Sequence, residues 1–380
     1  MTNQPAERFE RKQQDYLTNL KIFLTSLVVI HHASQSYSLT DNRWPLKDGA
    51  ATPLTSFFFD YFASVNNAFF MALFFLISGM LIQGSLDRHG LRGTLTNKVR
   101  RLLVPALVFM LVVFPLFRVF LIPSGAEPLG VLLANYFAFP GGEITLGHTW
   151  YLVDLFLFIA LFLVLRKARG GPGKGTQIGG LQLGLLCLGV VGATFLVRCL
   201  FAPGYWLPLH LLEPARFLMY VFFFWMGTQS SRFVNLAHRP HLAVFAGTSS
   251  LLLILAGPAV VVVVLHNKDL WAFGMTGESL IVSTWECLLG LTLSGSLLLG
   301  FKRYLHTTNR LLTSLGRASF GVYLIHPFVV MATQAGVNGL AIPIGVKFCL
   351  SAGLSVGASY FLVVLAGSLR GTRRRMVPSD

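Results

Sequence analysis

Residues 57–84 have the sequence FFFDYFASVNNAFFMALFFLISGMLIQG, in which Asp60 is the single charged residue. A helix needs about 20 apolar residues to cross the hydrocarbon core of a bilayer, and this run is longer than that. The stretch therefore predicts a membrane-spanning helix.

The composition of the whole chain extends this prediction. Of the 380 residues, 54% are hydrophobic and 12% are charged, and the mean hydropathy is +0.65. Ordinary soluble domains are about 25% charged, so this chain has too few polar side chains to cover a soluble globule. We expect an all-α integral membrane protein.

Ten apolar runs, separated by short polar connections, are candidates for membrane spans. They comprise residues 18–38, 57–84, 102–122, 151–165, 181–201, 217–231, 242–265, 279–300, 318–337 and 343–368. The sixth is short and has the least certain boundaries. We expect an N-terminal tail at residues 1–16, one transmembrane domain at residues 17–368 and a basic C-terminal tail at residues 369–380.

The net charge of +15 is distributed unevenly over the connections. The two tails and the even-numbered loops together carry +17, whereas the odd-numbered loops carry −3. Basic residues accumulate in cytoplasmic loops, so both termini are predicted to be cytoplasmic. This distribution explains the high charge without nucleic acid as a partner.

Two features have no chemical role in this interpretation. The four cysteines lie in apolar runs without CxxC spacing, so neither a disulfide framework nor a metal site is expected. The Gly-rich stretch 170–180 lacks the Ser or Thr of a phosphate loop after Lys174, which indicates a cytoplasmic linker.

Ionisable residues inside the first run are the strongest functional signal. Lys21 and His32 are eleven positions apart, so on a helix they share one face and lie about 16 Å apart along the axis. His31 lies about 80° away from that face, which favours His32 as the functional partner of Lys21. The alternative is that Lys21 extends to the interface while both histidines pack or bind backbone.

A candidate site for an anionic donor lies at the cytoplasmic end of the next two runs. Ser78 and Gly79 are small residues that would let a ligand approach the backbone. Lys98 and Arg101 follow in the next loop, where their charges could bind phosphate.

Polar residues at the opposite side form a candidate acceptor site. The predicted acceptor-side residues are His148, Trp150, Asp60 and Asp154. Carboxylates among aromatic side chains suit a ligand rich in hydroxyl groups. Other charged residues of the outer half, Arg118, Arg198 and Lys347, could instead be interfacial anchors or form ion pairs between helices.

Five motifs occur in an order that resembles a known family. They are Lys21 with His32, FFLISG (74–79), KVRR before LLVP (98–105), HTWYL (148–152) and SFGVYLIHP (319–327). Together they resemble the membrane-bound acyltransferase-3 family over most of the chain.

The resemblance implies transfer of an acyl group, commonly acetyl, from cytoplasmic acyl-CoA to a hydroxyl of an extracytoplasmic glycan or other envelope acceptor. Acyl-CoA would be a co-substrate, with no permanently bound cofactor. The catalytic pair of the family corresponds to Lys21 and His32, with His32 as general base or transient acyl carrier. The RxxR element corresponds to Lys98 and Arg101. Lys21 and Lys98 replace the usual arginines, which retains the charge but loses the bidentate fork.

Two questions stay open at this stage. His326 could face the donor channel or satisfy a backbone carbonyl freed by Pro327, and we favour the second role. A secondary transporter or flippase of an envelope precursor is the main alternative function, although the sequence shows no inverted repeat. A non-enzymatic scaffold or sensor would leave the Lys21 and His32 pair unexplained.

Overall fold

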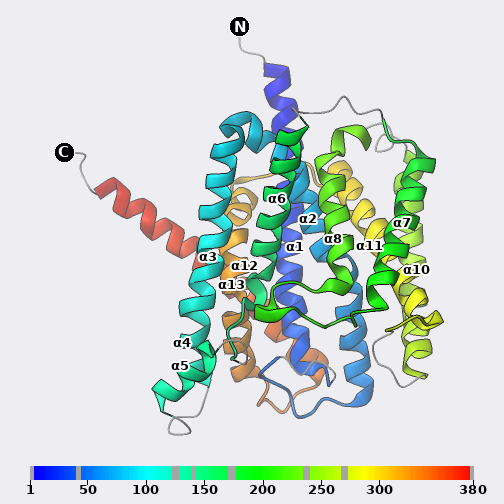
Figure 1. The fold of residues 1–380 in the computed structure, drawn as a ribbon. Coiled ribbons are helices and arrows are strands. Elements are labelled where there is room, and N and C mark those ends of the chain that lie inside the picture. Colours follow the sequence, from blue (N-terminus) through cyan, green and yellow to red (C-terminus); the bar gives the residue numbers. More distant parts are fainter. Residues whose placement is uncertain are drawn as a thin grey trace. The chain divides into compact units, whose positions relative to one another are not determined.

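The computed structural model describes residues 4–39, 44–121, 128–138, 142–169, 177–233, 240–266 and 273–376 (Figure 1). These residues form helices joined by turns and include no strand. The all-α prediction is therefore confirmed. Most of the predicted linker at residues 170–180 lies outside the described residues.

Within the described residues every α-helix except α5 overlaps a predicted run, and α5 lies between the third and fourth runs. The α-helices are α1 (Gln4–Ser34), α2 (Pro53–Lys98), α3 (Val104–Val108), α4 (Phe114–Leu121), α5 (Leu129–Phe137), α6 (Trp150–Ala168), α7 (Gly180–Arg198), α8 (Pro214–Thr228), α10 (Pro240–His266), α11 (Gly277–Tyr304), α12 (Arg310–Val337) and α13 (Ile344–Met376). Helix α1 begins inside the predicted tail at residues 1–16, and α13 continues into the predicted tail at residues 369–380.

Seven helical segments of the described chain are long and apolar enough to cross a membrane. One of them, Pro53–Arg118, combines the second and third predicted runs. Helix α1, which carries Lys21 and two histidines, and the 15-residue α8 are not among the seven. The protein is thus a multi-pass membrane protein, and the count of ten spans stays a prediction.

The long segment Pro53–Arg118 is not one straight helix. Gly90 has φ of 63° and ψ of −176°, a conformation that ordinary residues rarely adopt, and it breaks α2 near the end of the second predicted run. Two π turns follow, at Val99–Leu103 and Phe109–Val113. Because a break and two changes of helical pitch interrupt the segment, the second and third runs can still be separate spans.

Prolines inside the helices leave backbone carbonyls without their usual donors, and side chains replace those donors. Pro258 in α10 cannot donate to the carbonyl of Ile254, which instead accepts a hydrogen bond from the Tyr61 hydroxyl. The Met110 carbonyl, five residues before Pro115 in a π turn, accepts one from the Tyr136 hydroxyl at 2.8 Å. Such replacement is needed where no water can reach the backbone.

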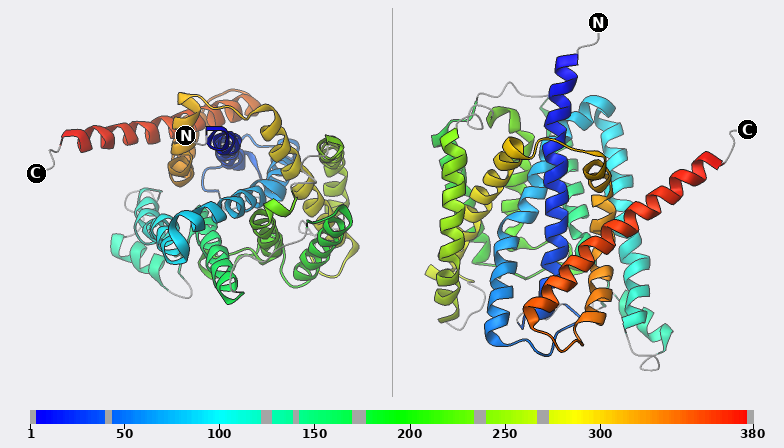
Figure 2. Two further views of the ribbon diagram at one scale, coloured as in Figure 1. Left: turned by 90° about the horizontal axis from the view of Figure 1, so that it is seen from above. Right: turned by 180° about the vertical axis from the view of Figure 1, so that it is seen from behind.

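The chain divides into two compact units. Unit 1 comprises Met1–Phe74, Arg239–Val261 and Leu288–Asp380. In it α1 packs against α12 and α13, and Figure 2 shows α13 crossing both helices. Gly316 permits the close approach of α12 to α1, because a Cβ there would collide with the Thr18 side chain.

Unit 2 comprises Phe75–His238 and Val262–Cys287. Helix α7 packs against α8, and α6 packs against α3 and the π turn before it. The fully buried Phe75 is at the centre, where its ring contacts those of Tyr151, Phe158 and Tyr220 at centroid distances of 4.8, 4.9 and 5.1 Å. This core fixes α2, α6 and α8 relative to one another.

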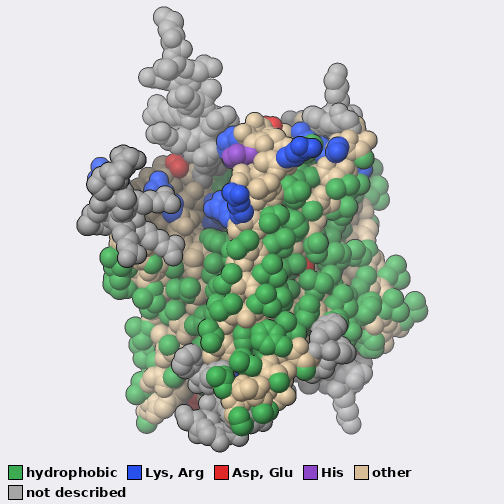
Figure 3. All heavy atoms as spheres, turned by 60° about the vertical axis from the view of Figure 1, so that its left-hand side comes forward, with side chains coloured by type: hydrophobic (Ala, Val, Ile, Leu, Met, Phe, Trp, Pro, Cys, Tyr) green, Lys and Arg blue, Asp and Glu red, His purple; other side chains and the backbone are tan. Residues whose placement is uncertain are grey.

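The surface of the helices is rich in apolar side chains. Leu107, Leu111 and Leu116, after the Gly90 break, are 47%, 46% and 55% exposed. Figure 3 shows hydrophobic side chains over much of one face, with Lys and Arg gathered toward one end. An apolar surface with charges at its end is suited to contact with lipid.

Gly79 is predicted to be essential for packing within unit 2. A Cβ at Gly79 would collide with the backbone of Phe224 and Gly227 in α8, whereas a Cβ at Gly84 would make only ordinary contacts with the Arg88 side chain. We expect Gly79→Ala to lower the free energy of unfolding by about 1–3 kcal/mol, because overpacking displaces backbone. Gly84→Ala on the same helix is the control. Equal thermal stability of the two variants in detergent would contradict this packing.

Candidate functional site

The His32 side chain is held by contacts from three segments of unit 1. Its Nδ1 donates a hydrogen bond to Oε1 of Gln35 at 3.0 Å. Its ring stacks on those of Trp44 and His326, with centroid distances of 5.6 and 4.9 Å and interplanar angles of 11° and 23°. Because a carbonyl oxygen can only accept, Nδ1 carries the proton and the neutral ring has its lone pair on Nε2. The ring remains partly exposed.

The neighbouring His31 has a different environment. It is 4% exposed, and its ring contacts Phe70 at a centroid distance of 5.1 Å. Helix α1 is continuous from Gln4 to Ser34, so Lys21 and His32 share one face as the sequence analysis assumed. Of the two histidines, His32 is the more exposed.

The loop after α1 covers His32 through a chain of hydrogen bonds. The indole Nε1 of Trp44 donates to Oε1 of Gln334 at 2.7 Å, and Nε2 of Gln334 donates to the Ala33 carbonyl at 2.9 Å. Farther along the loop, Nζ of Lys347 forms an ion pair with Asp48 at 2.9 Å. These contacts fix Trp44 against His32.

The predicted donor-binding residues Ser78, Gly79, Lys98 and Arg101 belong to unit 2. The Ser78 hydroxyl forms a hydrogen bond of 3.0 Å with that of Tyr151. Gly79 packs closely against the backbone of α8. Lys98 and Arg101 lie close enough for their charges to interact, and neither has an acidic partner within the described residues. Two adjacent unpaired cations are suited to a phosphate group.

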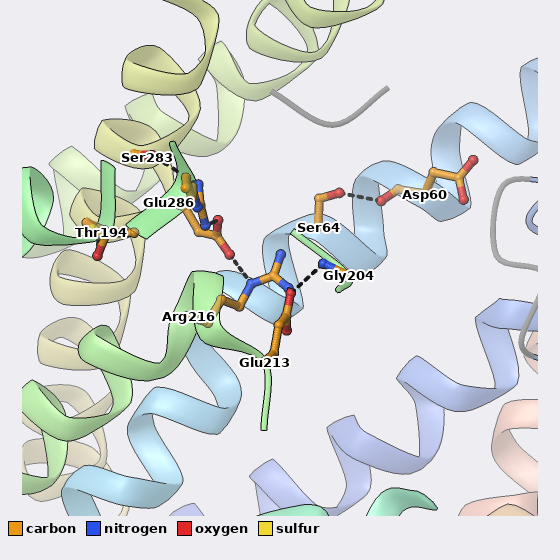
Figure 4. Close-up of polar contacts among 10 residues, drawn as sticks. Asp60, Ser64, Thr194, Gly204, Glu213, Arg216, Ser283 and Glu286 are labelled. Carbon is orange, nitrogen blue, oxygen red and sulfur yellow. Dashed lines mark hydrogen bonds and ion pairs between the residues drawn. The ribbon is translucent and has the colours of Figure 1, made fainter. Parts of the chain in front are cut away.

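The predicted acceptor-side residues fall into three different environments. The ring of His148 packs against those of Phe109 and Phe114, at centroid distances of 5.6 and 5.7 Å. Asp60, in unit 1, accepts hydrogen bonds from the hydroxyls of Ser38 and Ser56, and its carbonyl accepts one from Ser64 (Figure 4). These serines give Asp60 a structural role.

Trp150 and Asp154 are one turn apart on α6 in unit 2. The Trp150 ring contacts those of Trp206 and Tyr220 at 5.2 and 5.8 Å. Asp154 is 1% exposed, close enough to Tyr220 for an electrostatic interaction, and neither carboxyl oxygen has a partner in the described part of the chain. Nε1 of Trp206 is also buried and without an acceptor there. The carboxyl group of Asp154 and the indole N–H of Trp206, both without a hydrogen-bond partner in the described structure, thus lie around the same cluster of aromatic rings. This arrangement is suited to a hydroxyl-bearing ligand.

Similarity to known proteins identifies the family of the chain. The family model described as an acyltransferase domain matches residues 14–369, nearly the whole chain. The chain belongs to the membrane-bound acyltransferase-3 family. No curated protein and no solved structure gives a significant match.

Membership in the acyltransferase-3 family shows that the protein is an acyltransferase, and its helices show that it is a multi-pass membrane protein. This confirms the family and the enzyme class that the motifs predicted.

The other charged residues that were predicted to lie in the outer half are ion-paired, one of the two alternatives that the sequence left open. Arg118 pairs with Glu143, Lys347 with Asp48 and Arg198 with Glu286. In unit 2, Arg216 binds both Glu286 and Glu213, and Glu213 accepts the Gly204 backbone N–H at 2.7 Å (Figure 4). These residues anchor helices and loops.

Several residues of the site were not predicted. Gln35, Trp44 and Tyr220 contact the predicted residues, yet no motif distinguished them. For Gln35 there was a signal, because it follows His32 by three positions on a helix and could be expected to contact it. Trp44 lies in a loop whose path the sequence does not reveal.

Replacement of Asp154 separates a binding role from a structural one. We expect Asp154→Asn to leave stability unchanged or raised, because no hydrogen bond within the described structure is lost and a buried carboxyl is removed. The same variant should raise KM for the acyl acceptor. Asp60→Asn is the control, expected to cost about 1–3 kcal/mol because two serine hydroxyls lose a charged acceptor. Equal destabilisation of both variants would show that Asp154 is structural.

Proposed function

We propose that the protein transfers an acyl group, acetyl in the first instance, from cytoplasmic acyl-CoA to a hydroxyl of an extracytoplasmic glycan or other envelope acceptor. Both termini would be cytoplasmic, and the membrane would be a bacterial cytoplasmic membrane. The observation that carries the proposal is the environment of His32, a partly exposed imidazole whose Nδ1 is bound to Gln35 and whose ring is stacked on two others.

His32 would act through Nε2. As general base, Nε2 takes the proton of the acceptor hydroxyl while the oxygen attacks the thioester carbonyl carbon. The carbon–sulfur bond then breaks, and the thiolate of CoA receives the proton from Nε2, so that the products are the ester and free CoA. In the alternative mechanism Nε2 itself carries the acyl group between donor and acceptor.

The cationic residues would bind the donor. Lys21 lies about 16 Å from His32 along α1, a distance that the pantetheine arm of CoA can largely bridge. Lys98 and Arg101 supply two neighbouring positive charges for the phosphates, and Ser78 would lie beside the arm.

The acceptor would bind among the aromatic residues of α6 and α8. Trp150 and Tyr220 offer apolar ring surfaces, Asp154 can accept hydrogen bonds from hydroxyl groups, and Nε1 of Trp206 can donate one. These features support a hydroxyl-rich acceptor.

The proposal is tested by incubating the purified protein with radiolabelled acetyl-CoA and an envelope extract. We expect label to appear in the extract as an alkali-labile ester. Mild base should release that label and neutral buffer should not, as expected for an ester. A secondary transporter or flippase would instead move a component of the extract into vesicles, and that component would carry no label. This result would reject acyl transfer.

A further inference from the structure

We propose that His326 is a positioning residue for His32 and that Pro327 makes this role possible. The inference rests on the proposed function, because it assigns a task to His326 in the reaction of His32. It goes beyond the expectation that His326 only satisfies a backbone carbonyl.

The position of His326 follows from the proline that comes after it in α12. Pro327 has no N–H, so it cannot donate to the carbonyl of Tyr323 four residues earlier. Nδ1 of His326 donates to that carbonyl at 2.7 Å, and the side chain is fully buried. The contact fixes both the orientation of the ring and its tautomer, with the lone pair of the neutral ring on Nε2.

A histidine is not required merely to satisfy such a carbonyl. In the same unit the carbonyl that Pro258 leaves open accepts a hydrogen bond from the Tyr61 hydroxyl. What His326 adds is an imidazole ring whose centroid lies 4.9 Å from that of His32 at an interplanar angle of 23°. The carbonyl of Tyr323 thus serves as the anchor for a ring that packs against the proposed base.

The ring of His326 restricts the orientation of His32. Rotation of the His32 ring about its Cβ–Cγ bond would move Nε2 and would also disturb the stacking on His326 and Trp44. A base must stay within hydrogen-bonding reach of the proton that it removes, and small displacements can cost about 100-fold in rate. Loss of the His326 ring is therefore expected to lower kcat and to leave KM for acetyl-CoA unchanged.

Four variants separate the ring from the hydrogen bond. In His326→Ala both are lost, and in His326→Asn an N–H donor remains without the ring. In His326→Phe a ring remains without the donor. The double variant His326→Phe with Pro327→Ala retains a ring and supplies the Tyr323 carbonyl with the backbone N–H of residue 327. Pro258→Ala, in α10, is the control for removal of a helical proline.

The measurement is consumption of radiolabelled acetyl-CoA in the presence of envelope extract, with kcat and KM determined for each folded variant. We expect His326→Ala and His326→Asn to lower kcat about 10–100-fold at unchanged KM for acetyl-CoA. The double variant should recover to within about threefold of the parent protein, and Pro258→Ala should stay within about twofold.

The outcomes distinguish this inference from the proposed function. Loss of turnover in His32→Ala together with an unchanged kcat in His326→Asn would overturn the positioning role and leave the proposed function intact. A double variant as slow as His326→Ala would also overturn it, because an aromatic ring at position 326 would then not be enough to position His32. Retention of turnover in His32→Ala would overturn both proposals.

Discussion

Replacement of His32 by Ala is expected to abolish acyl transfer, with a loss of about 1,000-fold or more, while the protein still inserts and folds. The imidazole would supply both general base catalysis, worth about 100–10,000-fold, and the correct orientation of the acceptor. The side chain is partly exposed, so its removal leaves a smaller packing defect than removal of a buried core residue would. The measurement is ester formation from radiolabelled acetyl-CoA by equal amounts of monodisperse protein.

His31→Ala is the matched control on the same helix. His31 is 4% exposed and packs on Phe70, so this variant should lose stability but retain a rate within about tenfold of the parent protein. If transfer survived in His32→Ala and disappeared in His31→Ala, the argument from helical faces would be wrong.

Replacement of Glu286 by Gln is expected to lower the free energy of unfolding by about 3–5 kcal/mol. Glu286 is 3% exposed and binds both Arg198, which is fully buried, and Arg216. Without its carboxylate, Arg198 would be left as a buried cation, whereas Arg216 would retain Glu213. Thermal or denaturant unfolding in detergent provides the measurement.

Two further variants test whether the unpaired charge is the cause. Glu278→Gln, in the first turn of the same helix α11, is a less buried control and should change stability by about 0.5 kcal/mol or less. Adding Arg198→Met to Glu286→Gln should recover much of the loss, because the buried cation is then removed as well. Equal stabilities of Glu286→Gln and Glu278→Gln would show that the network contributes little.

The helices could be predicted from sequence because membrane insertion requires long apolar runs. Each of the ten runs overlaps a helix of the structure, and the uncertain sixth run corresponds to the short α8. The local features around Pro258 and Pro327 could be predicted in part, since a missing N–H must leave a carbonyl in need of a donor. The expectation that His326 binds such a carbonyl is confirmed.

Contacts between distant segments could not be predicted in the same way. Glu286 binds arginines that are 88 and 70 positions away, and Trp44 reaches Gln334 across 290 positions. No periodicity connects such residues, and without aligned relatives there is no covariation to indicate them. The sequence therefore indicated that Arg198 could be an interfacial anchor or form an ion pair, but it did not indicate that Glu286, Arg216 and Glu213 form its network.

The central claim is transfer of an acyl group across the membrane, and sealed proteoliposomes test it most directly. Radiolabelled acetyl-CoA is added to the outside, and envelope extract is enclosed within the vesicles, with protein inserted in both orientations. The account predicts ester-linked label on the enclosed acceptor, with free CoA outside and no label in vesicles that contain His32→Ala. Label that appeared in the lumen as intact acetyl-CoA, or ester formation that was equal in the His32→Ala vesicles, would contradict it.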